Sequence, residues 1–194
     1  MRFKELLTDI DAKFDASFDA TVTGLCCDSR VIKPGDVFFA LAGARDNGVK
    51  YVEAAIHGGA VAVVYDAPLA LNHPIPCVIV SDARAALAIM AARFYGFPPK
   101  SFYLTGVTGT NGKTTLTYLL ENLWQPEKTG VIGTVNTRFA GLTLNATHTT
   151  PDVIGLNEIF SRMCAHGITR VAMEVSSHAL DQKRVHDCEF DAAV

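Results

Sequence analysis

Apolar residues in the first half of the chain recur in two alternating patterns, one helical and one extended. Residues 51–57 have helical spacing and stop at Gly58-Gly59, and the apolar run at 60–65 is typical of a buried strand. Residues 77–80 form a second such run. A helix is then predicted from an N-cap at Ser81 to Gly96, because apolar side chains recur at i, i+3, i+4 and i+7 (Leu87, Met90, Ala91 and Phe94).

The second half continues this alternation with longer elements. Strands are predicted at 101–107, 129–135 and 168–175, and residues 190–194 look like the opening of another strand. A helix is predicted at 114–124, with Leu116, Leu119, Leu120 and Leu123 on one side. Another is predicted from Asp152 to His166, ending at Gly167, with Val153, Leu156, Phe160 and Met163 inward and Pro151 at its first position. The fold class is α/β, with helices packed on mostly parallel sheets.

Pro98-Pro99 is the clearest boundary in the sequence. Two prolines can neither continue a helix nor donate hydrogen bonds to a sheet ladder. We therefore predict two domains, residues 1–98 and residues 99–194.

Composition excludes several classes of protein. The 20 acidic and 17 basic residues give a net charge of −3, and a nucleic-acid-binding protein would normally show a basic stripe. No apolar run approaches the ~18 residues that a membrane helix requires, and residues 1–11 lack a secretory apolar region. We expect a cytoplasmic protein without nucleic-acid or membrane partners. The five cysteines include no CxxC pair and are expected to be buried, reduced thiols.

The strongest chemical signal is a glycine-rich segment between a predicted strand and a predicted helix. Such a loop can turn backbone N–H groups around phosphate oxygens at a helix N-terminus. Lysine can then reach the β- and γ-phosphates, and the next hydroxyl can bind Mg²⁺. The usual pattern would place glycine where Val107 stands, so this is a variant loop; a purely structural turn is the alternative. The candidate ATP-binding residues are Gly109, Thr110, Asn111, Gly112, Lys113, Thr114 and Thr115.

Three further clusters carry polar chemistry. Glu174 ends an apolar strand, where a carboxylate is costly unless it meets a cation or a donor, so it is a candidate metal ligand or a carboxylate bonded to a loop. His178 follows it and is a weaker candidate. Thr149 and Thr150 precede a predicted helix start and can bind a ligand or simply cap the helix. The Asp28-Ser29-Arg30 turn is either a surface salt bridge or an anion and hydroxyl reader.

Together these clusters resemble the Mur ligases of peptidoglycan synthesis over nearly the whole chain. Residues 108–115 look like the family's variant phosphate loop, and residues 28–64 resemble its small N-terminal domain. The segments 148–152 and 174–184 are most similar to the ligases that attach the third residue of the peptide. The loop that begins at Asp46 departs from the family's usual pattern, which leaves its contacts open.

The resemblance implies a set of roles for the site residues. Ser29 and the backbone at Cys27 would contact the uridine diphosphate group. Lys113 and Thr114 would bind ATP and Mg²⁺, with Glu174 on the same metal and His178 at a second one. The muramoyl dipeptide of UDP-MurNAc-L-Ala-D-Glu would be held by Thr149, Thr150, Ser176, Gln182 and Arg184.

The implied fold is a small N-terminal UDP-binding domain followed by the first part of a P-loop-type ATPase domain. The implied reaction is ATP-dependent amide bond formation through an acyl phosphate, with a diamino acid, meso-diaminopimelate or L-lysine, as the incoming amine. Relatives continue far past Val194, so this chain is expected to lack turnover by itself. The oligomeric state is open. Two alternatives are a folylpolyglutamate-synthase-like ligase, which would not explain the first ~100 residues, and a nucleotide-binding module without catalysis, which would not need the substrate residues.

Overall fold

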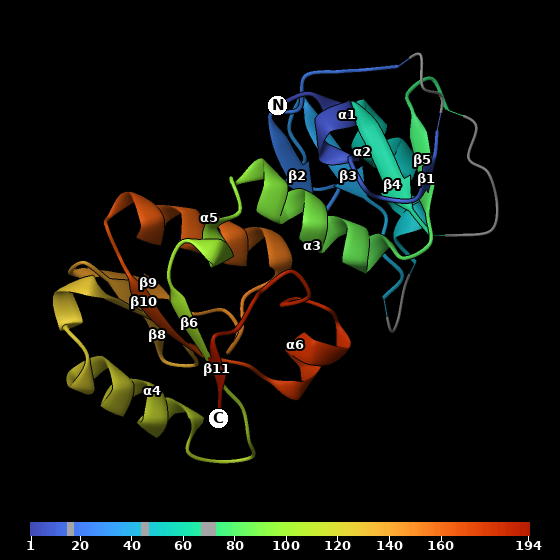
Figure 1. Ribbon diagram of the computed structural model, residues 1–194. Helices are drawn as coiled ribbons and strands as arrows, with labels where there is room; N and C mark the ends of the chain where they lie inside the picture. Colours follow the sequence, from blue (N-terminus) through green and yellow to red (C-terminus); the bar gives the residue numbers. More distant parts are fainter. Residues whose placement is uncertain (15–17, 44–46, 67–72) are drawn as a thin grey trace. The chain divides into compact units, whose positions relative to one another are not determined.

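The computed structural model describes residues 1–14, 18–43, 47–66 and 73–194, and Asp46 lies outside these ranges. The chain forms two compact units, Met1–Met90 and Ala91–Val194, which are shown in Figure 1. The division between them falls inside the helix that leads to Pro98-Pro99. For the domains of the whole protein, the boundary at 98/99 stays a prediction.

The first unit is built on a mostly parallel sheet of five strands, in the order β1-β5-β4-β3-β2. β2 to β5 run parallel, and β1 pairs with β5 in the antiparallel direction. Strands that are buried on both faces read as continuous apolar runs, and β3 and β4 are buried at every position. The strands are β1 (Ala12–Lys13), β2 (Gly24–Cys26), β3 (Asp36–Phe39), β4 (Ala62–Tyr65) and β5 (Cys77–Val80).

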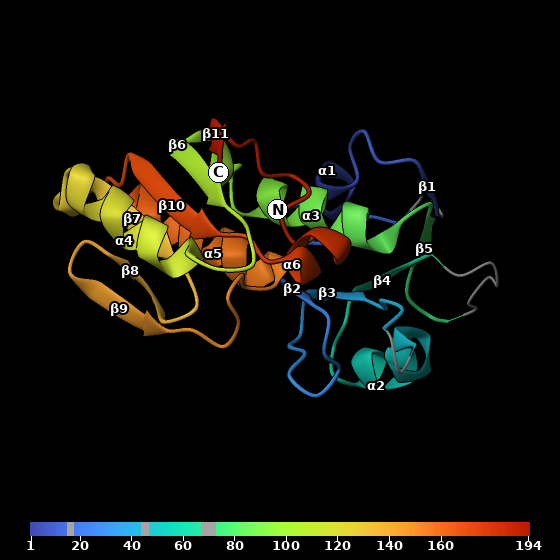
Figure 2. The ribbon, with the colours of Figure 1, turned by 90° about the horizontal axis from the view of Figure 1, so that it is seen from below.

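Helices cover both faces of this sheet, as Figure 2 shows. α2 (Val52–His57) lies on one face, and α1 (Phe3–Leu6) and the start of α3 (Ala83–Phe94) lie on the other. A short 3-10 helix, η1 (Gly48–Tyr51), leads into α2. The predicted N-cap at Ser81 is wrong by one residue: the Asp82 carboxylate accepts the Ala85 backbone N–H at 2.8 Å, because aspartate caps the first turn through its side-chain oxygen.

The second unit contains a sheet of six strands in the order β11-β6-β10-β7-β8-β9. The first four of these run parallel, and β8 and β9 form an antiparallel hairpin at the β7 edge. The strands predicted at 101–107, 129–135, 168–175 and 190–194 are all present. The strands are β6 (Tyr103–Val107), β7 (Thr129–Ile132), β8 (Asn136–Phe139), β9 (Leu142–Asn145), β10 (Arg170–Glu174) and β11 (Ala192–Ala193).

Two long helices cover opposite faces of this second sheet (Figure 1). α5 (Val153–Ala165) contributes its apolar side chains to a core shared with alternate residues of β10, and α4 (Lys113–Leu123) packs against β6, β7 and β10 on the other face. Because side chains alternate along a strand, Val171 and Met173 face α5, and Glu174 faces α4. The shorter helices are η2 (Pro98–Lys100), η3 (Pro126–Lys128) and α6 (Ser177–Asp181).

Two details of these helices differ from the predictions. Pro151 lies before the α5 cap, and Asp152 is the N-cap, its carboxylate accepting the Gly155 backbone N–H at 2.9 Å. The leucine side of α4 is largely open, with Leu119 60% and Leu123 78% exposed. The helix instead buries Thr117, whose hydroxyl donates to the Thr114 carbonyl oxygen.

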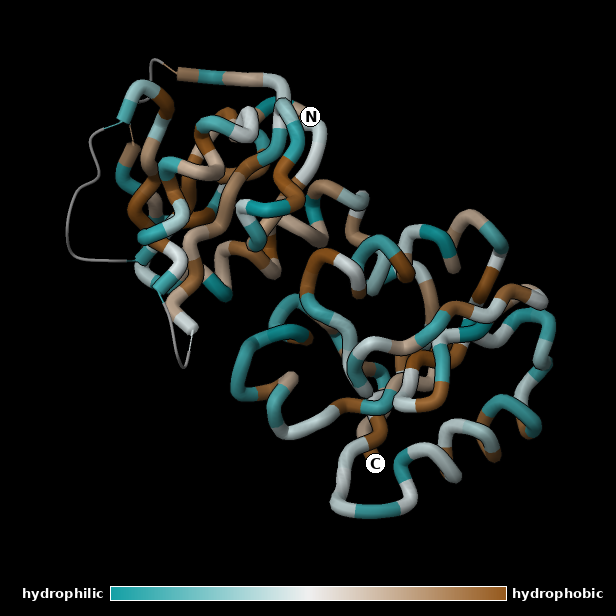
Figure 3. Tube along the Cα trace, turned by 180° about the vertical axis from the view of Figure 1, so that it is seen from behind, coloured by the Kyte–Doolittle hydropathy of each residue, from teal (hydrophilic) through white to brown (hydrophobic). Residues whose placement is uncertain are grey.

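The hydropathy of the chain follows the layers in each unit, with the hydrophobic segments in the central strands and hydrophilic segments in the turns (Figure 3). No helix among the described residues combines the length and the apolar character needed to cross a membrane. All five cysteines lie within the described ranges and are thiols, as predicted. Their predicted burial holds for Cys26 alone: Cys77, Cys164 and Cys188 are partly buried, and Cys27 is exposed.

Candidate functional site

The glycine-rich loop connects the carboxyl end of β6 to the N-terminus of α4. Gly109 has φ of +132° and Gly112 has φ of +82°, conformations that an L side chain rarely adopts. Both hinges of the variant loop therefore require glycine, and residues 108–112 are exposed. The Lys113 ammonium folds back over the loop, where Nζ donates to the Gly109 carbonyl oxygen at 2.6 Å. The loop, the lysine and the helix start thus surround one position that suits a phosphate group.

Glu174 lies beside this loop at the carboxyl end of β10 and is only 1% exposed. Its Oε1 accepts the Thr114 hydroxyl at 2.9 Å and the Thr134 backbone N–H at 3.2 Å, and its Oε2 accepts the Thr134 hydroxyl at 2.9 Å. All three partners donate, which is the arrangement that a buried carboxylate needs. The structure thus brings together Thr114 and Glu174, two residues predicted to bind the same metal ion.

The carboxylate of Glu174 is seated against the backbone that follows β7. A Cβ atom at Gly133 would lie 2.3 Å from Glu174 Oε1, closer than real Cβ contacts allow. Glycine is therefore needed at this position to admit the carboxylate. Neither Gly133 nor Thr134 was predicted as a site residue, although they follow a parallel strand at its carboxyl end, where open α/β sheets place their ligands.

The oxygen donors at this position fit Mg²⁺. Magnesium is a hard cation that takes oxygen ligands, and it is commonly held by one or two carboxylates together with phosphate oxygens and water. The Thr114 hydroxyl and the Glu174 carboxylate supply such oxygens next to the phosphate loop. His178 lies exposed in α6, and the described residues contain no group of three or more His, Cys, Asp or Glu side chains arranged to hold a metal.

The predicted substrate residues gather around the same strand end. The Thr150 hydroxyl donates to the Glu174 carbonyl oxygen at 2.8 Å and accepts the Ser176 backbone N–H at 3.1 Å. The Thr149 hydroxyl lies 3.1 Å from that of Thr134. Thr150 is fully buried, and these hydrogen bonds of its hydroxyl tie the loop to β10.

Arg184 is held over this loop by hydrogen bonds to two residues. Its Nη1 donates to the Thr150 carbonyl oxygen at 2.7 Å, and Nε and Nη2 donate to Gln182 Oε1 at 3.1 and 2.8 Å. The Ser176 hydroxyl accepts the Ala179 backbone N–H and caps α6. The five predicted dipeptide-binding residues therefore lie in one connected cluster next to Glu174.

The first unit carries a separate hollow of about 400 Å³ lined by Cys27, Asp28, Ser29, Arg30 and Tyr51. Arg30 donates to both carboxylate oxygens of Asp28, from Nε at 2.9 Å and from Nη2 at 2.6 Å. These hydrogen bonds lower the pKa of Asp28 to about 2. The salt bridge that the sequence left open is thus formed, and it lies at the wall of a hollow that contains Ser29.

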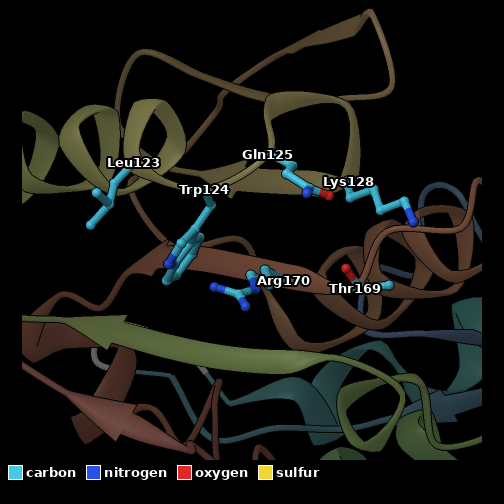
Figure 4. Close-up of a pocket in the computed structure, with 6 residues that line it drawn as sticks. All are labelled: Leu123, Trp124, Gln125, Lys128, Thr169 and Arg170. Carbon is cyan, nitrogen blue, oxygen red and sulfur yellow. The ribbon is translucent and has the colours of Figure 1, made fainter.

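A further hollow of about 390 Å³ opens in the second unit and lies apart from these clusters (Figure 4). Trp124 and Arg170 form its centre, with the guanidinium carbon 5.6 Å from the indole ring. Arg170 begins β10 and Glu174 ends it, so this hollow lies at the opposite end of the strand from the phosphate loop. None of the residues predicted from the sequence to bind ATP, metal or substrate lines it.

Comparison with known proteins gives family matches in both units. Residues 21–95 match the description "Mur ligase family, catalytic domain", and residues 107–194 match "Mur ligase middle domain". Relatives include two proteins named UDP-N-acetylmuramoyl-L-alanyl-D-glutamate–2,6-diaminopimelate ligase. That of Caldanaerobacter subterraneus subsp. tengcongensis is 41% identical over 100% of this chain and 41% of its own length. That of Geobacillus thermodenitrificans is 45% identical over 89% of this chain and 35% of its own.

A solved structure of a ligase with the same name superposes with a TM-score of 0.72 at 27% identity, covering 89% of this chain and 35% of that one. The chain therefore spans about two fifths or less of the length of the relatives it matches. The Mur ligase matches cover residues 21–95 and 107–194 of the chain. The chain belongs to the Mur ligase family.

Proposed function

We propose that the protein carrying this chain is the ATP-dependent ligase known as MurE, which adds meso-diaminopimelate to UDP-MurNAc-L-Ala-D-Glu in the cytoplasmic steps of peptidoglycan synthesis. The observation that carries the proposal is the 2.9 Å contact between Thr114 at the start of the phosphate-loop helix and Glu174 at the end of β10. Two relatives with 41% and 45% identity carry the name of this ligase.

In this proposal the phosphate loop holds ATP. Backbone N–H groups of residues 109–115 surround the phosphates, and Lys113 reaches the β- and γ-phosphates once it leaves the Gly109 carbonyl oxygen. Thr114 and Glu174 hold one Mg²⁺, and His178 contributes to a second. Bound Mg²⁺ supplies positive charge to the phosphate oxygens.

The UDP-linked substrate occupies two clusters in this proposal. The hollow of the first unit takes the uridine diphosphate through Ser29 and the backbone at Cys27. The cluster next to Glu174 takes the muramoyl dipeptide, with Arg184 and Gln182 fixed toward each other by two hydrogen bonds. Thr150 acts mainly as a fixing residue, because its hydroxyl is bonded to the backbone of Glu174 and Ser176 and its carbonyl oxygen accepts from Arg184.

The proposed chemistry has two steps, and the first asks little covalent work of the protein. The glutamyl carboxylate attacks the γ-phosphorus of ATP, and the bond from this phosphorus to ADP breaks as the acyl phosphate forms. The incoming amine then displaces phosphate and loses a proton to form the amide. Phosphoryl transfer is catalysed chiefly by positioning and by cations on the developing charge. Lys113 supplies one of these cations, and the Thr114–Glu174 pair fixes where another is bound.

The test separates the two ligand sites with one lysine variant and one control. Lys113→Ala in the protein carrying this chain should lower ligation by about 100-fold or more, since a preorganised charge on the transferred group is worth that much. Binding of the UDP substrate should persist. Lys128→Ala removes an exposed lysine from η3, away from the loop, and should leave both unchanged.

Ligation is followed by phosphate release and by product mass with ATP, Mg²⁺, UDP-MurNAc-L-Ala-D-Glu and either meso-diaminopimelate or L-lysine. Equal loss of substrate binding and ligation in Lys113→Ala would count against separate sites. ATP binding without any product from either diamino acid would favour a nucleotide-binding module without catalysis. The 194 residues alone span at most about two fifths of their relatives and are expected to show no turnover.

A further inference from the structure

We propose that Thr134 is a positioning residue that holds Glu174 in place and, through the direction of its hydroxyl proton, makes Thr149 a hydrogen-bond acceptor for substrate. This inference rests on the function proposed above. It concerns a residue that the sequence did not single out, located directly after β7 and Gly133.

Thr134 contacts both oxygens of the Glu174 carboxylate. Its backbone N–H donates to Oε1 at 3.2 Å, and its hydroxyl donates to Oε2 at 2.9 Å. The third donor, the Thr114 hydroxyl, is also the group expected to turn toward Mg²⁺. With Thr114 turned away, Thr134 supplies the contacts that keep the carboxylate in one orientation. Groups of this kind, which orient a metal ligand, are typically worth 10–100-fold in metal affinity.

The hydroxyl of Thr134 has two neighbours but a single proton. Glu174 Oε2 lies at 2.9 Å and Thr149 Oγ1 lies at 3.1 Å. Both oxygens of Glu174 accept hydrogen bonds at this site, whereas a hydroxyl can both donate and accept. The proton of Thr134 therefore points to Glu174, and the contact with Thr149 is made by the proton of Thr149. The direction of donation is Thr149 to Thr134 to Glu174.

This direction limits what Thr149 can bind. Because its own proton is directed to Thr134, the hydroxyl of Thr149 presents lone pairs to a ligand. Its partner on the substrate is then an N–H or O–H donor, such as a peptide amide or a sugar hydroxyl. As long as this proton stays on Thr134, Thr149 does not donate to a carboxylate or phosphate oxygen of the ligand. Arg184, which can only donate, follows α6 and contacts the loop that carries Thr149, so it is the complementary group for such oxygens.

The first experiment measures metal binding, which does not depend on turnover. Mn²⁺ replaces Mg²⁺ in the protein carrying this chain, with ADP present, and bound Mn²⁺ is quantified by electron paramagnetic resonance. Thr134→Val removes the hydroxyl at nearly constant shape and should weaken Mn²⁺ binding about 10-fold, whereas Thr134→Ser should stay within about 3-fold of the unaltered protein. Thr143→Val, at an exposed threonine of β9, is the matched control and should change nothing.

The second experiment tests the direction of donation in the absence of metal and nucleotide. Affinity for UDP-MurNAc-L-Ala-D-Glu is compared with affinity for UDP by calorimetry. Thr134→Val should weaken binding of the full substrate about fivefold, the value of one ordinary hydrogen bond, and leave UDP binding unchanged. If Thr134 acts through Thr149, the double variant with Thr149→Val should bind no more weakly than Thr149→Val alone.

The outcomes distinguish the two proposals. If the unaltered protein binds neither Mn²⁺ nor the UDP substrate, the proposed function and this inference both fail. If it binds both and Thr134→Val binds them equally well, or Thr134→Ser is as weak as Thr134→Val, this inference alone is overturned. Additive losses in the double variant would overturn the link to Thr149. Thr134→Ala, checked for folding by circular dichroism, replaces Thr134→Val if the latter does not fold.

Discussion

Glu174 shows how a single buried carboxylate depends on its immediate neighbours. The side chain is 1% exposed, and three donated hydrogen bonds offset the cost of removing it from water. Space is the second requirement, because a Cβ at Gly133 would lie 2.3 Å from Oε1. The geometry of this site is thus fixed by a glycine and a threonine that carry no charge.

Gly133→Ala should therefore displace the carboxylate and weaken metal binding. The added methyl pushes Oε1 away from the Thr114 hydroxyl, and we expect Mn²⁺ affinity to fall at least about 10-fold, as for the loss of an orienting group. Gly155→Ala is the control, because the new Cβ meets Asp152 at an ordinary 3.5 Å inside α5. Equal Mn²⁺ affinities for the two variants would contradict this account of the site.

The cysteines should differ sharply in their reactivity toward a thiol reagent. Cys27 is exposed in the hollow of the first unit, whereas burial raises the pKa of Cys188 to about 12. The thiolate is the nucleophile. At pH 8 a pKa of about 12 leaves only about one Cys188 in 10⁴ deprotonated, far fewer than for a thiol with the usual pKa of about 8.5. Iodoacetamide followed by mass spectrometry should modify Cys27 first, and UDP should slow that reaction.

The contribution of Cys188 to stability depends on pH, and its sign follows from the raised pKa of the thiol. Because the pKa of this thiol is higher in the folded than in the unfolded state, its contribution to stability is fully present below about pH 8.5. The contribution is lost as the pH rises toward about 12. Cys188 should stay unmodified between pH 7 and 9 and react once urea unfolds the chain. Modification of Cys188 at pH 7 in the folded protein, at the rate of Cys27, would contradict its burial.

At the scale of elements, one ion pair joins the β8–β9 hairpin to α4. Arg138 on β8 donates from Nε to both carboxylate oxygens of Glu121 on α4, at 2.9 and 3.0 Å, and its guanidinium carbon lies 3.9 Å from the ring centre of Tyr118. Both charged side chains are less than 20% exposed. An arginine guanidinium that pairs with a carboxylate through several N–H groups and also stacks on an aromatic ring cannot be replaced by a lysine ammonium.

Arg138→Lys should accordingly lower the free energy of unfolding by about 1–3 kcal/mol, less than for a fully buried pair because this one is partly solvated. Urea unfolding monitored by circular dichroism measures the change. Arg30→Lys, which alters a more exposed pair with side chains 86% and 40% exposed, is the control and should leave the midpoint in place. A shift of the same size in both variants would mean that the stacking and burial of Arg138 add nothing.

The elements that the sequence predicted correctly are those with strong periodicity or a glycine stop. The β8–β9 hairpin was missed because its turn is Ala140-Gly141, both with positive φ, rather than the Asn-Gly that usually marks such a turn. The leucine pattern of α4 identified an apolar side but not the side that packs, since Thr117 is the buried residue. Periodicity shows which residues share a face, and the neighbouring strands decide which face is covered.

The sequence predicted those site residues whose side-chain type and position in a motif indicate their chemistry. The loop at 108–115 and Glu174 combine reactive side chains with a strand end, and the structure places Thr114 and Glu174 in contact. Thr134 has an ordinary hydroxyl on a short turn, and only the sheet order β6-β10-β7 brings that turn to Glu174. A linear sequence carries no direct signal of such a neighbour, because it depends on which strands pair.

At the scale of the whole molecule, each unit has its own sheet and its own core. A cluster that includes Phe38, Val63 and Tyr65 fills one face of the first sheet, and a separate cluster that includes Leu104, Phe160 and Met173 lies between α5 and the second sheet. Units with separate cores can open and close separately. The hollow proposed to bind uridine lies in the first unit and the loop proposed to bind ATP lies in the second, so each ligand should stabilise mainly the unit that holds it.

Hydrogen exchange followed by mass spectrometry should show this division directly. A ligand at 100 times its Kd stabilises the state that binds it by about 2.7 kcal/mol, which slows exchange through opening of that unit by about 100-fold. UDP should slow exchange in β2, β3 and β4, and leave β6, β7 and β10 nearly unchanged. ADP with Mg²⁺ should do the reverse. Lys113→Ala should abolish the protection by ADP with Mg²⁺ and leave the protection by UDP unchanged. Equal protection of both sheets by either ligand would show that the units open as one body and that the two sites are energetically coupled.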